Sequence, residues 1–404
     1  MGLNNRRSTS FSVSKNTPQS LRKDHGLQPM LSRRLLKNLD WMLIASAMGI
    51  VAFGFLAIAS ATRSWAPDPY YYVKRQAIWL LLGLAEVVIV LFIDYNTFAS
   101  LSRVIYAGNL GLLAAVLVAG NVKLGAQRWI AIGSFELQPS EMAKVAMVLT
   151  LAALLRNREG KLEGWPDLVM PFIHIGLPML LILKQPDLGT SLVFMAILLG
   201  ELFMAGAPLK KLAIVYGGGL ALVVAAISLH FKFGLPILLQ DYQLNRLLVF
   251  LNPQADPLGA GYHVIQSTIA LGSGGLFGKG LFAGTQNRLN FLPEQHTDFI
   301  FSVIAEEMGF IGILALLILF FILIYRGIRI IAQAKDMYGV LVATGVTTTF
   351  AFHVLVNVGM TAGIMPVTGI PLPMVSYGGS SMLASFFGIG LLLNVHMRHH
   401  KIQF

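Results

Sequence analysis

The sequence predicts an all-α polytopic membrane protein with about ten transmembrane helices, and three observations lead to that prediction. Of the 404 residues, 55% are hydrophobic and only 12% are charged, which is far from the composition of a soluble domain. Apolar stretches close to the roughly 20 residues that a bilayer requires recur along most of the chain. One long polar segment, residues 252–307, interrupts them. Because single-domain membrane bundles of this size are common, we expect one domain.

Ten apolar stretches are read as spans, which places both ends of the chain on one side of the membrane. A large loop, residues 231–297, then lies outside the membrane between the seventh and eighth helices, within a membrane domain of residues 41–397. The predicted spans are Trp41–Ala61, Gln76–Ile93, Val104–Ala119, Pro139–Leu155, Leu168–Leu183, Leu188–Ala205, Leu212–Leu229, Asp298–Tyr325, Tyr338–Gly359 and Pro373–His396.

Both ends of the chain are polar and basic. Residues 1–40 mix basic side chains with Ser, Asn and Gln, and they could be mistaken for a targeting peptide. However, the apolar run that begins at Trp41 lacks a small-residue cleavage pattern at signal-peptide spacing and is long enough to span. We therefore expect residues 1–40 to be a disordered cytoplasmic tail and residues 398–404 to be a cytoplasmic C-terminus.

The distribution of positive charge predicts the orientation. The formal net charge is +11, and much of the basic excess lies in the tail and in short loops that fall on one face. By the positive-inside rule that face is cytoplasmic. Nucleic-acid binding would need a basic face on a folded soluble element, and the sequence has none. Outside the tail, the basic residues of this face are Arg103, Arg156, Arg158, Lys161, Lys210, Lys211, Arg326, Arg329, Lys335, Arg398 and Lys401.

The polar segment 252–307 is the largest feature predicted for the opposite, outer face. Its many glycines let the backbone bend sharply and approach a ligand closely. A disordered linker would carry few large apolar residues, yet this segment keeps Tyr262, Ile265 and Phe282. A loop of this length inside a compact membrane protein is usually functional. We expect a folded cap over a cavity, ending with Asp298 at the mouth of the next span.

A second outer-face motif begins a helix. In Gln138-Pro-Ser-Glu-Met-Ala-Lys144 the proline suits the first helical position, and Glu141 lies in the first turn, where the helix dipole favours an anion. Glu141 and Lys144 are three residues apart and share a helix face. A local ion pair near the headgroups is the simpler interpretation. We favour a functional pair, because ionisable side chains within spans are costly and usually line a cavity.

Two further outer-face segments leave their roles open. Asp187, in Gln-Pro-Asp-Leu-Gly-Thr-Ser at a helix start, either caps that helix or belongs to a site. Residues 357–381 are rich in proline and glycine and suggest a re-entrant or broken-helix connection. The small residues at 378–381 suit close helix packing better than chemistry.

Isolated ionisable residues complete the candidates. Asp298 follows His296 and Thr297 at a helix mouth, where one carboxylate could be a base, an ion ligand or a structural cap. The chain has no cysteine, which excludes a disulfide framework and a thiolate metal site. It also lacks a P-loop, a dinucleotide fingerprint and a zinc-binding His-Glu helix. The ionisable residues interpreted as polar packing contacts in spans are Glu86, Glu201 and His353, and the helix after Asp298 also carries Glu306 and Glu307.

Several of these blocks, taken in order, resemble one known family. The SEDS family comprises the RodA/FtsW polymerases of bacterial peptidoglycan, and the resemblance extends over residues 41–396. The run FGKGLFAGTQNRLNFLPEQHTDFIF is similar to the RodA branch, which acts in cell elongation, more than to the FtsW branch, which acts in division. The basic tail is longer than that branch leads us to expect. The matching blocks are GAQRW, QPSEMAK, QPDLGTS, GSGGLFGKG, LPEQHTDFIF and GIPLPMVSYGGSS.

The resemblance implies a peptidoglycan glycosyltransferase with ten membrane helices in the bacterial cytoplasmic membrane. Its substrate would be lipid II, the undecaprenyl-pyrophosphate disaccharide-pentapeptide, and its product a glycan strand. A class B penicillin-binding protein would be the transpeptidase partner, beside other membrane proteins of the elongation complex. The family's essential carboxylate corresponds to Asp298. The expected substrate contacts are Glu141, Lys144, Arg75, Arg128, Trp129, Arg246 and Asp187.

The implied chemistry needs a single carboxylate. Pyrophosphate leaves as a stable anion, so no general acid is required, unlike the hydrolysis of a sugar–sugar bond. Asp298 would take the proton from the acceptor hydroxyl, and attack on the opposite face would convert an α-linked donor into a β-1,4 glycan. Arg and Lys side chains would screen the pyrophosphate. A divalent cation could help, although no ligand cluster in the sequence demands one.

Two other functions compete with this interpretation. A lipid II flippase would also need a membrane cavity lined by Lys, Glu and Arg. Transporters often have broken helices at matching positions of two repeats, whereas here no clear repeat is present and the polar groups gather toward one face. A non-catalytic scaffold of the wall-synthesis complex would need no ionisable cavity.

Overall fold

The computed structural model describes residues 38–64, 68–123, 126–133, 135–158, 160–234, 236, 241–257, 259–289 and 291–399. Most of the predicted N-terminal tail, residues 1–37, and residues 400–404 of the predicted C-terminus lie outside this range. Asp40, the last residue of the predicted tail, caps the first described helix, because its Oδ1 accepts a hydrogen bond from the Leu43 N–H at 3.0 Å. Its carboxylate also pairs with Arg326, 2.6 Å away.

Each predicted span coincides with a long helix, so the prediction of a helical membrane protein is confirmed. Eight of the described helices are long and apolar enough to cross a membrane, while α6 and α8 have 17 residues each. The total of ten spans stays a prediction. The helices are α2 (Trp41–Thr62), α3 (Tyr71–Phe92), α5 (Ser102–Ala119), α6 (Pro139–Leu155), α7 (Trp165–Lys184), α8 (Leu188–Met204), α9 (Leu209–Phe233), α13 (Ile300–Gln333), α14 (Met337–Thr361) and α15 (Gly379–Met397).

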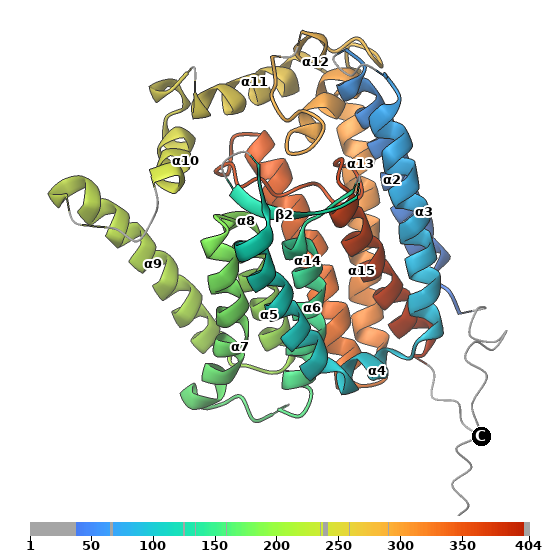
Figure 1. Cartoon of the computed structure of the whole chain (residues 1–404), viewed down its shortest axis with the longest axis vertical. Helices are drawn as coiled ribbons and strands as arrows, with labels where there is room; N and C mark the ends of the chain where they lie inside the picture. Colours follow the sequence, from blue (N-terminus) through green and yellow to red (C-terminus); the bar gives the residue numbers. More distant parts are fainter. Residues whose placement is uncertain are drawn as a thin grey trace, which may run out of the picture.

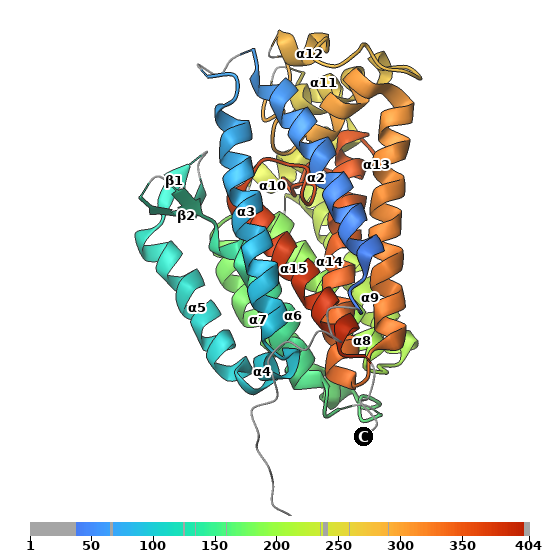
Figure 2. The same ribbon diagram turned by 90° about the vertical axis from the view of Figure 1, so that its right-hand side faces the viewer.

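Helix α14 is central to the bundle, where it contacts α13, α8, α6 and α15 (Figures 1 and 2). Helix α3 packs along α15, and α2 packs along α13. Close packing of α3 on α15 depends on small residues, since a Cβ at Gly379 would clash with the Trp79 ring. Helix α9 leans away from the bundle, and Leu212 is the only buried side chain among its described residues. Its exposed apolar surface suits a lipid environment.

A small antiparallel sheet, absent from the sequence prediction, lies between α5 and α6. Strands β1 (Asn121–Lys123), β2 (Ala126–Ile132) and β3 (Phe135–Leu137) pair in the order β1-β2-β3. Hydropathy patterns did not predict these strands, because two of the three have only three residues each. The strand β2 carries Arg128 and Trp129, so the sheet determines where both side chains lie. A six-residue helix, α4 (Tyr95–Ser100), joins α3 to α5 at the other end of the bundle.

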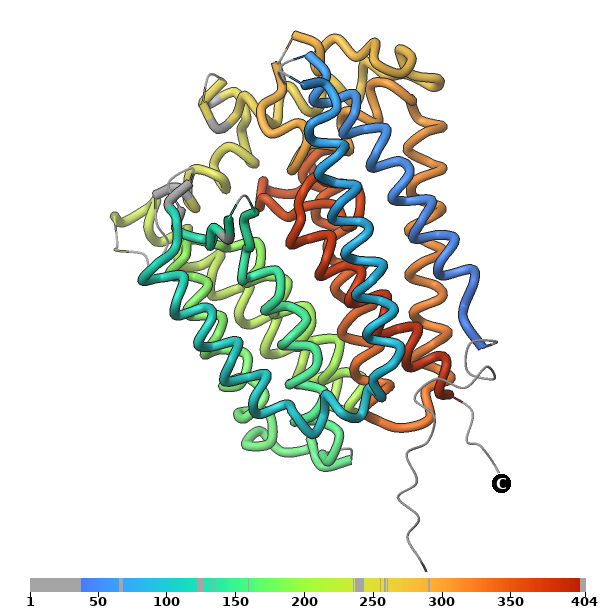
Figure 3. The backbone as a smooth tube through the Cα atoms, turned by 45° about the vertical axis from the view of Figure 1, so that its right-hand side comes forward, coloured from blue at the N-terminus to red at the C-terminus, as the bar shows by residue number. Residues whose placement is uncertain are grey.

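The segment expected to form the outer cap contains three short α-helices and a 3-10 turn. These are α10 (Asp241–Leu251), η1 (Pro253–Ala255), α11 (Ala260–Ser273) and α12 (Thr285–Arg288). They lie across one end of the bundle, as Figures 1 and 3 show. The boundary predicted at residue 231 differs from the structure, because α9 continues to Phe233. We refer to residues 241–289 as the cap.

A kink in α13 attaches the cap to the bundle. Gly309 has φ 65°, a left-handed conformation that glycine adopts without strain, and it interrupts the helical hydrogen bonds. The carbonyls of Glu306 and Glu307 accept hydrogen bonds from the N–H groups of Lys279 and Gly280 at 2.9 and 3.0 Å. In return, the Phe310 N–H donates to the Gly275 carbonyl at 2.9 Å. The glycine-rich loop of the cap therefore replaces the backbone partners that the kink removes.

Candidate active site

A cavity of about 280 Å³ lies beneath the cap and contains every predicted site residue except Arg75. Its walls come from β2, the N-terminal ends of α6, α8 and α15, helix α10, the segment before α13, and α14 with the loop that follows it. The cavity combines seven charged side chains with uncharged polar groups. The charged residues that line it are Arg128, Glu141, Lys144, Asp187, Arg246, Glu294 and Asp298.

Asp298 occupies the wall where the cap meets α13. Its backbone carbonyl accepts a hydrogen bond from Nδ2 of Asn357 at 3.0 Å. Burial, and after it the nearby Glu294, raise the pKa of its carboxyl, which reaches about 6. Arg246 and Arg128 oppose that rise. A carboxyl with this pKa is mostly ionised at neutral pH and still basic enough to accept a proton.

The interpretation of Asp298 as a helix cap is not supported by the geometry. The residue at the cap position of α13 is Phe299, and no side chain makes a capping hydrogen bond there. Among the described residues no group of three or more His, Asp or Glu side chains is arranged to hold a metal ion.

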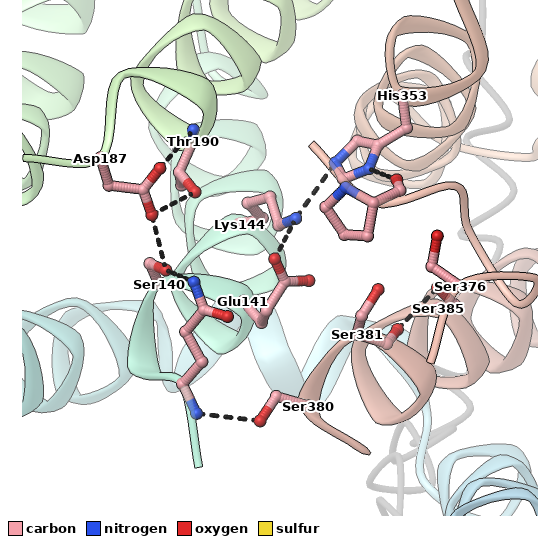
Figure 4. A network of polar contacts seen from close by, with 12 residues as sticks. Ser140, Glu141, Lys144, Asp187, Thr190, His353, Ser376, Ser380, Ser381 and Ser385 are labelled. Carbon is pink, nitrogen blue, oxygen red and sulfur yellow. Dashed lines mark hydrogen bonds and ion pairs between the residues drawn. The ribbon is translucent and has the colours of Figure 1, made fainter. Parts of the chain in front are cut away.

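Glu141 and Lys144 form a buried ion pair in the first two turns of α6. The Lys144 Nζ lies 2.8 Å from Glu141 Oε1, and each side chain is only 5% exposed. The Nζ also lies 3.0 Å from His353 Nε2 on α14 (Figure 4). The prediction that these two residues share a cavity-facing surface of the helix agrees with this geometry. His353, interpreted from the sequence as a polar packing contact, makes such a contact with Lys144 and also lines the cavity.

Asp187 is both a helix cap and a cavity residue. Its Oδ1 accepts a hydrogen bond from the Thr190 N–H at 3.1 Å, which caps the N-terminus of α8. Its Oδ2 accepts hydrogen bonds from the hydroxyls of Thr190 and Ser140 at 2.9 and 3.2 Å (Figure 4). The two alternatives weighed from the sequence are therefore compatible. Capping fixes the carboxylate in the cavity wall.

Arg128 supports the wall that it also lines. Its Nε donates to the Gln185 carbonyl at 2.8 Å, and its Nη2 donates to the carbonyl of Pro186. These two bonds join β2 to the turn that precedes Asp187. Trp129 follows on the same strand, and Arg246 reaches the cavity from α10 in the cap. Cationic groups thus approach the cavity from the sheet, from α6 and from the cap.

Arg75 lies outside the residues that line the cavity. On α3, its Nη1 donates to the Tyr71 hydroxyl at 2.9 Å, and its guanidinium lies over the rings of Tyr71 and Phe135. Cation–π contacts of this kind hold an arginine against aromatic neighbours. The structure places Arg75 beside β3 and so links α3 to the small sheet.

Several functional candidates escaped the sequence analysis. Ser380 accepts a hydrogen bond from the Gln138 N–H at 2.9 Å and lines the cavity together with Ser381, so this small-residue run does more than pack helices. The missing information was that the start of α15 lies beside Gln138, 242 residues away in the chain, because no local pattern records such a contact. Further lining residues that were not singled out from the sequence include Glu294, Thr368 and Tyr377.

The remaining buried carboxylates lie away from the cavity lining. Glu306 accepts hydrogen bonds from the cap through Lys279, Thr285 and Gln286, and Glu307 accepts from Ser60 and from the Phe282 N–H. Both residues therefore hold the cap on α13. Glu201, fully buried in α8, has no hydrogen-bond partner for either oxygen within the described part of the chain. It packs against Gly345 of α14.

Comparisons with known proteins place the chain among bacterial wall-synthesis proteins. Residues 40–401 match the FtsW/RodA/SpoVE family model, described as cell cycle protein. The peptidoglycan glycosyltransferase MrdB of Escherichia coli K12 is 39% identical over 365 residues, which cover 90% of this chain and 95% of the relative. The peptidoglycan glycosyltransferase RodA of Treponema pallidum is 34% identical, with coverage of 90% and 99%.

Solved structures of bacterial wall-synthesis proteins also resemble this chain. A chain from a peptidoglycan synthase complex that coordinates polymerisation and crosslinking superposes with a TM-score of 0.76 at 36% identity, covering 90% of this chain and 99% of that one. The rod shape determining protein RodA of Thermus thermophilus superposes with a TM-score of 0.67 at 32% identity, covering 90% and 98%.

Proposed function

The chain belongs to the FtsW/RodA/SpoVE family, and from this premise we propose that it is a peptidoglycan glycosyltransferase that polymerises lipid II during cell elongation. The transferase activity follows from relatives that carry this name at 39% and 34% identity over most of the chain. Lipid II as donor, inversion at the anomeric carbon and the role in elongation are the finer parts of the proposal.

The observation that carries the proposal is the position of the Asp298 carboxylate, which is partly desolvated and faces cations across the cavity. Asp298 lies where the cap meets the bundle, and the charges of Arg246 and Arg128 act on it. One base is enough for this transfer, because the pyrophosphate leaving group needs no proton. Asp298 removes the proton from the acceptor hydroxyl as that oxygen attacks the anomeric carbon. A positioned base of this kind contributes about 10²–10⁴-fold.

The cationic side chains take up the charge that develops on the leaving pyrophosphate. Lys144 has an ammonium group held in the wall by Glu141, and it therefore needs little reorganisation when the charge appears. Arg246 lines the same cavity from the cap, so cations on two sides of the cavity can contact the pyrophosphate. Guanidinium groups suit phosphate oxygens because they donate bidentately.

The same proposal places the cavity on the outer side of the cytoplasmic membrane. Basic residues that follow α6, α13 and α15, among them Arg156, Lys335 and Arg398, lie at the end of the bundle opposite the cap. The positive-inside rule makes that end cytoplasmic. A class B penicillin-binding protein would then crosslink the glycan as it leaves. The similarity to a chain from a synthase complex that coordinates polymerisation and crosslinking supports such a partner.

Polymerisation in detergent is the test that separates an enzyme from a flippase. The purified chain, with its transpeptidase, is expected to convert lipid II into long glycan without a sealed membrane. Translocation, by contrast, has no meaning in micelles. Failure of the wild-type chain to make polymer, together with lipid II movement across sealed vesicles, would contradict the proposal. Asp68→Asn is a suitable control, because Asp68 pairs with Lys74 on the exposed surface and should behave as wild type.

A further inference from the structure

Both ring nitrogens of His353 have a hydrogen-bond partner, one of which can only accept and the other only donate. Its Nδ1 lies 3.1 Å from the Pro371 carbonyl oxygen, and its Nε2 lies 3.0 Å from the Lys144 Nζ. The carbonyl can only accept, so Nδ1 carries the hydrogen. An ammonium group can only donate, so Nε2 must present its lone pair to Lys144. The two partners thus fix one neutral tautomer of the imidazole.

This arrangement fixes the orientation of the Lys144 ammonium group. One of the three ammonium hydrogens points to Glu141 Oε1 at 2.8 Å, and a second points to His353 Nε2. Two fixed hydrogen bonds leave the third hydrogen with one direction. Because Lys144 lines the cavity, that hydrogen is available to an oxygen of a bound phosphate.

The face of α14 that carries His353 also holds the base. Asn357 lies four residues further along, which is about one helical turn. Its Nδ2 donates to the Asp298 carbonyl at 3.0 Å and to the Ile370 carbonyl at 2.8 Å. The loop that contains Ile370 and Pro371 is therefore fixed to this face at two points. One rigid helix face contacts both the cation and the backbone of the base.

We propose that His353 is a positioning residue for glycan polymerisation, which orients the Lys144 ammonium toward the pyrophosphate while Asn357, one turn away, fixes Asp298. The inference rests on the proposed glycosyltransferase function and adds to it. His353 acts through Lys144 and does not itself touch the reacting atoms. Its contribution is geometric, since a misplacement of about 1 Å can cost roughly 10²-fold in rate.

Two substitutions separate positioning from simple packing. His353→Leu fills the space with an apolar side chain of moderate size and removes the hydrogen-bond acceptor for Lys144. His353→Gln keeps a carbonyl oxygen that can accept from the ammonium and an amide that can donate to Pro371. Thr344→Val is the matched control on α14, because the Thr344 hydroxyl donates only to the Val340 carbonyl of its own helix, at 2.7 Å.

The experiment measures kcat, KM for lipid II and the unfolding midpoint for each variant in complex with the transpeptidase. For His353→Leu we expect a fall of about 10²-fold in kcat with KM changed less than about threefold, because the charge that Lys144 meets is greatest in the transition state. His353→Gln should recover kcat to within about tenfold of wild type. Thr344→Val should match wild type in both constants.

Three outcomes would overturn the inference. The first is a wild-type kcat for His353→Leu. The second is an equal loss of kcat in His353→Leu and His353→Gln, with a lowered unfolding midpoint in both variants. The third is a rise in KM alone, which would make His353 a determinant of ground-state binding. Wild-type polymerisation in the same assay separates these results from failure of the proposed function, since an inactive wild type contradicts the glycosyltransferase assignment itself.

Discussion

The Lys279 Nζ lies 2.7 Å from Glu306 Oε1, and this ion pair joins the cap to the kinked helix α13. Glu306 also accepts hydrogen bonds from the backbone N–H groups of Thr285 and Gln286 at 2.8 and 3.1 Å. The carboxylate therefore gathers donors from two parts of the cap onto one helix. Because the cap carries Arg246 and forms part of the cavity wall, its attachment matters for the site as well as for folding.

Replacing Glu306 with alanine is expected to loosen the cap. The substitution leaves several donors without their acceptor, each at a cost of about 1–3 kcal/mol where water cannot reach. Hydrogen exchange in residues 276–289 should accelerate, and polymerisation should fall. Lys74→Ala, which removes an exposed surface pair, is the control and should change neither quantity. Unchanged exchange in Glu306→Ala would show that backbone bonds at the kink suffice.

The orientation of the bundle can be tested by labelling. The chain contains no cysteine, so single cysteines can be introduced without background. Gln254 in the cap and Lys335 at the opposite end are the two positions chosen. In intact spheroplasts, Gln254→Cys is expected to react with an impermeant thiol reagent, and Lys335→Cys only after the membrane is opened. Labelling of Lys335→Cys from outside would reverse the proposed topology.

Lys144→Ala is expected to abolish polymerisation. It also leaves the buried Glu141 unpaired, and breaking a buried pair usually costs about 3–5 kcal/mol. The double substitution Glu141→Leu with Lys144→Met removes both charges, which is often neutral for stability. We therefore expect the double variant to unfold near the wild-type temperature and to remain inactive. An active double variant would limit the pair to a structural role. Lys210→Ala, at the exposed start of α9, is the control and should polymerise lipid II as wild type does.

Activity and stability should respond to pH in opposite directions because both depend on Asp298. Its pKa rises from 3.8 to about 6 on folding. A base must be ionised, so kcat/KM should fall as the pH drops through about 6. The folded protein holds this proton more tightly than the unfolded chain, so stability should fall as pH rises from about 4 to about 6 and stay low above it.

The stability consequence is measurable with one substitution. A shift of about two pKa units corresponds to up to about 3 kcal/mol of stability lost at neutral pH. Asp298→Asn removes the ionisation, so its unfolding midpoint should exceed that of wild type at pH 7.5. The difference should vanish below about pH 3, where the Asp298 carboxyl is neutral in both the folded and the unfolded chain. Equal midpoints at pH 7.5 would mean that burial does not penalise the Asp298 carboxylate.

The sequence was most informative where a signal is local. Hydropathy located every long helix, and the three-residue spacing of Glu141 and Lys144 placed both on one helix face. The partner of Lys144 on α14 is 209 residues away, and no local pattern could reveal it. The same limit applies to Asp187, because only the fold brings Ser140 to its carboxylate.

Backbone irregularities were also beyond the sequence pattern. The kink at Gly309 is one glycine within a long apolar helix, where most glycines serve packing. Its meaning depends on the cap loop, because a Cβ at Gly309 would clash with the backbone of Leu276 and Gly278. The strand that carries Arg128 and Trp129 was missed because its pairing with β1 and β3, rather than its composition, defines it.

The most direct test of the central claim is the rate at which Asp298→Asn polymerises lipid II in detergent with the transpeptidase present. Asparagine is nearly isosteric with aspartate but cannot accept the proton, so a base is lost while the cavity keeps its shape. We expect glycan synthesis to fall by about 10²-fold or more, with lipid II binding retained. Glycan synthesis at the wild-type rate by Asp298→Asn would remove this carboxylate from the chemistry and contradict the account.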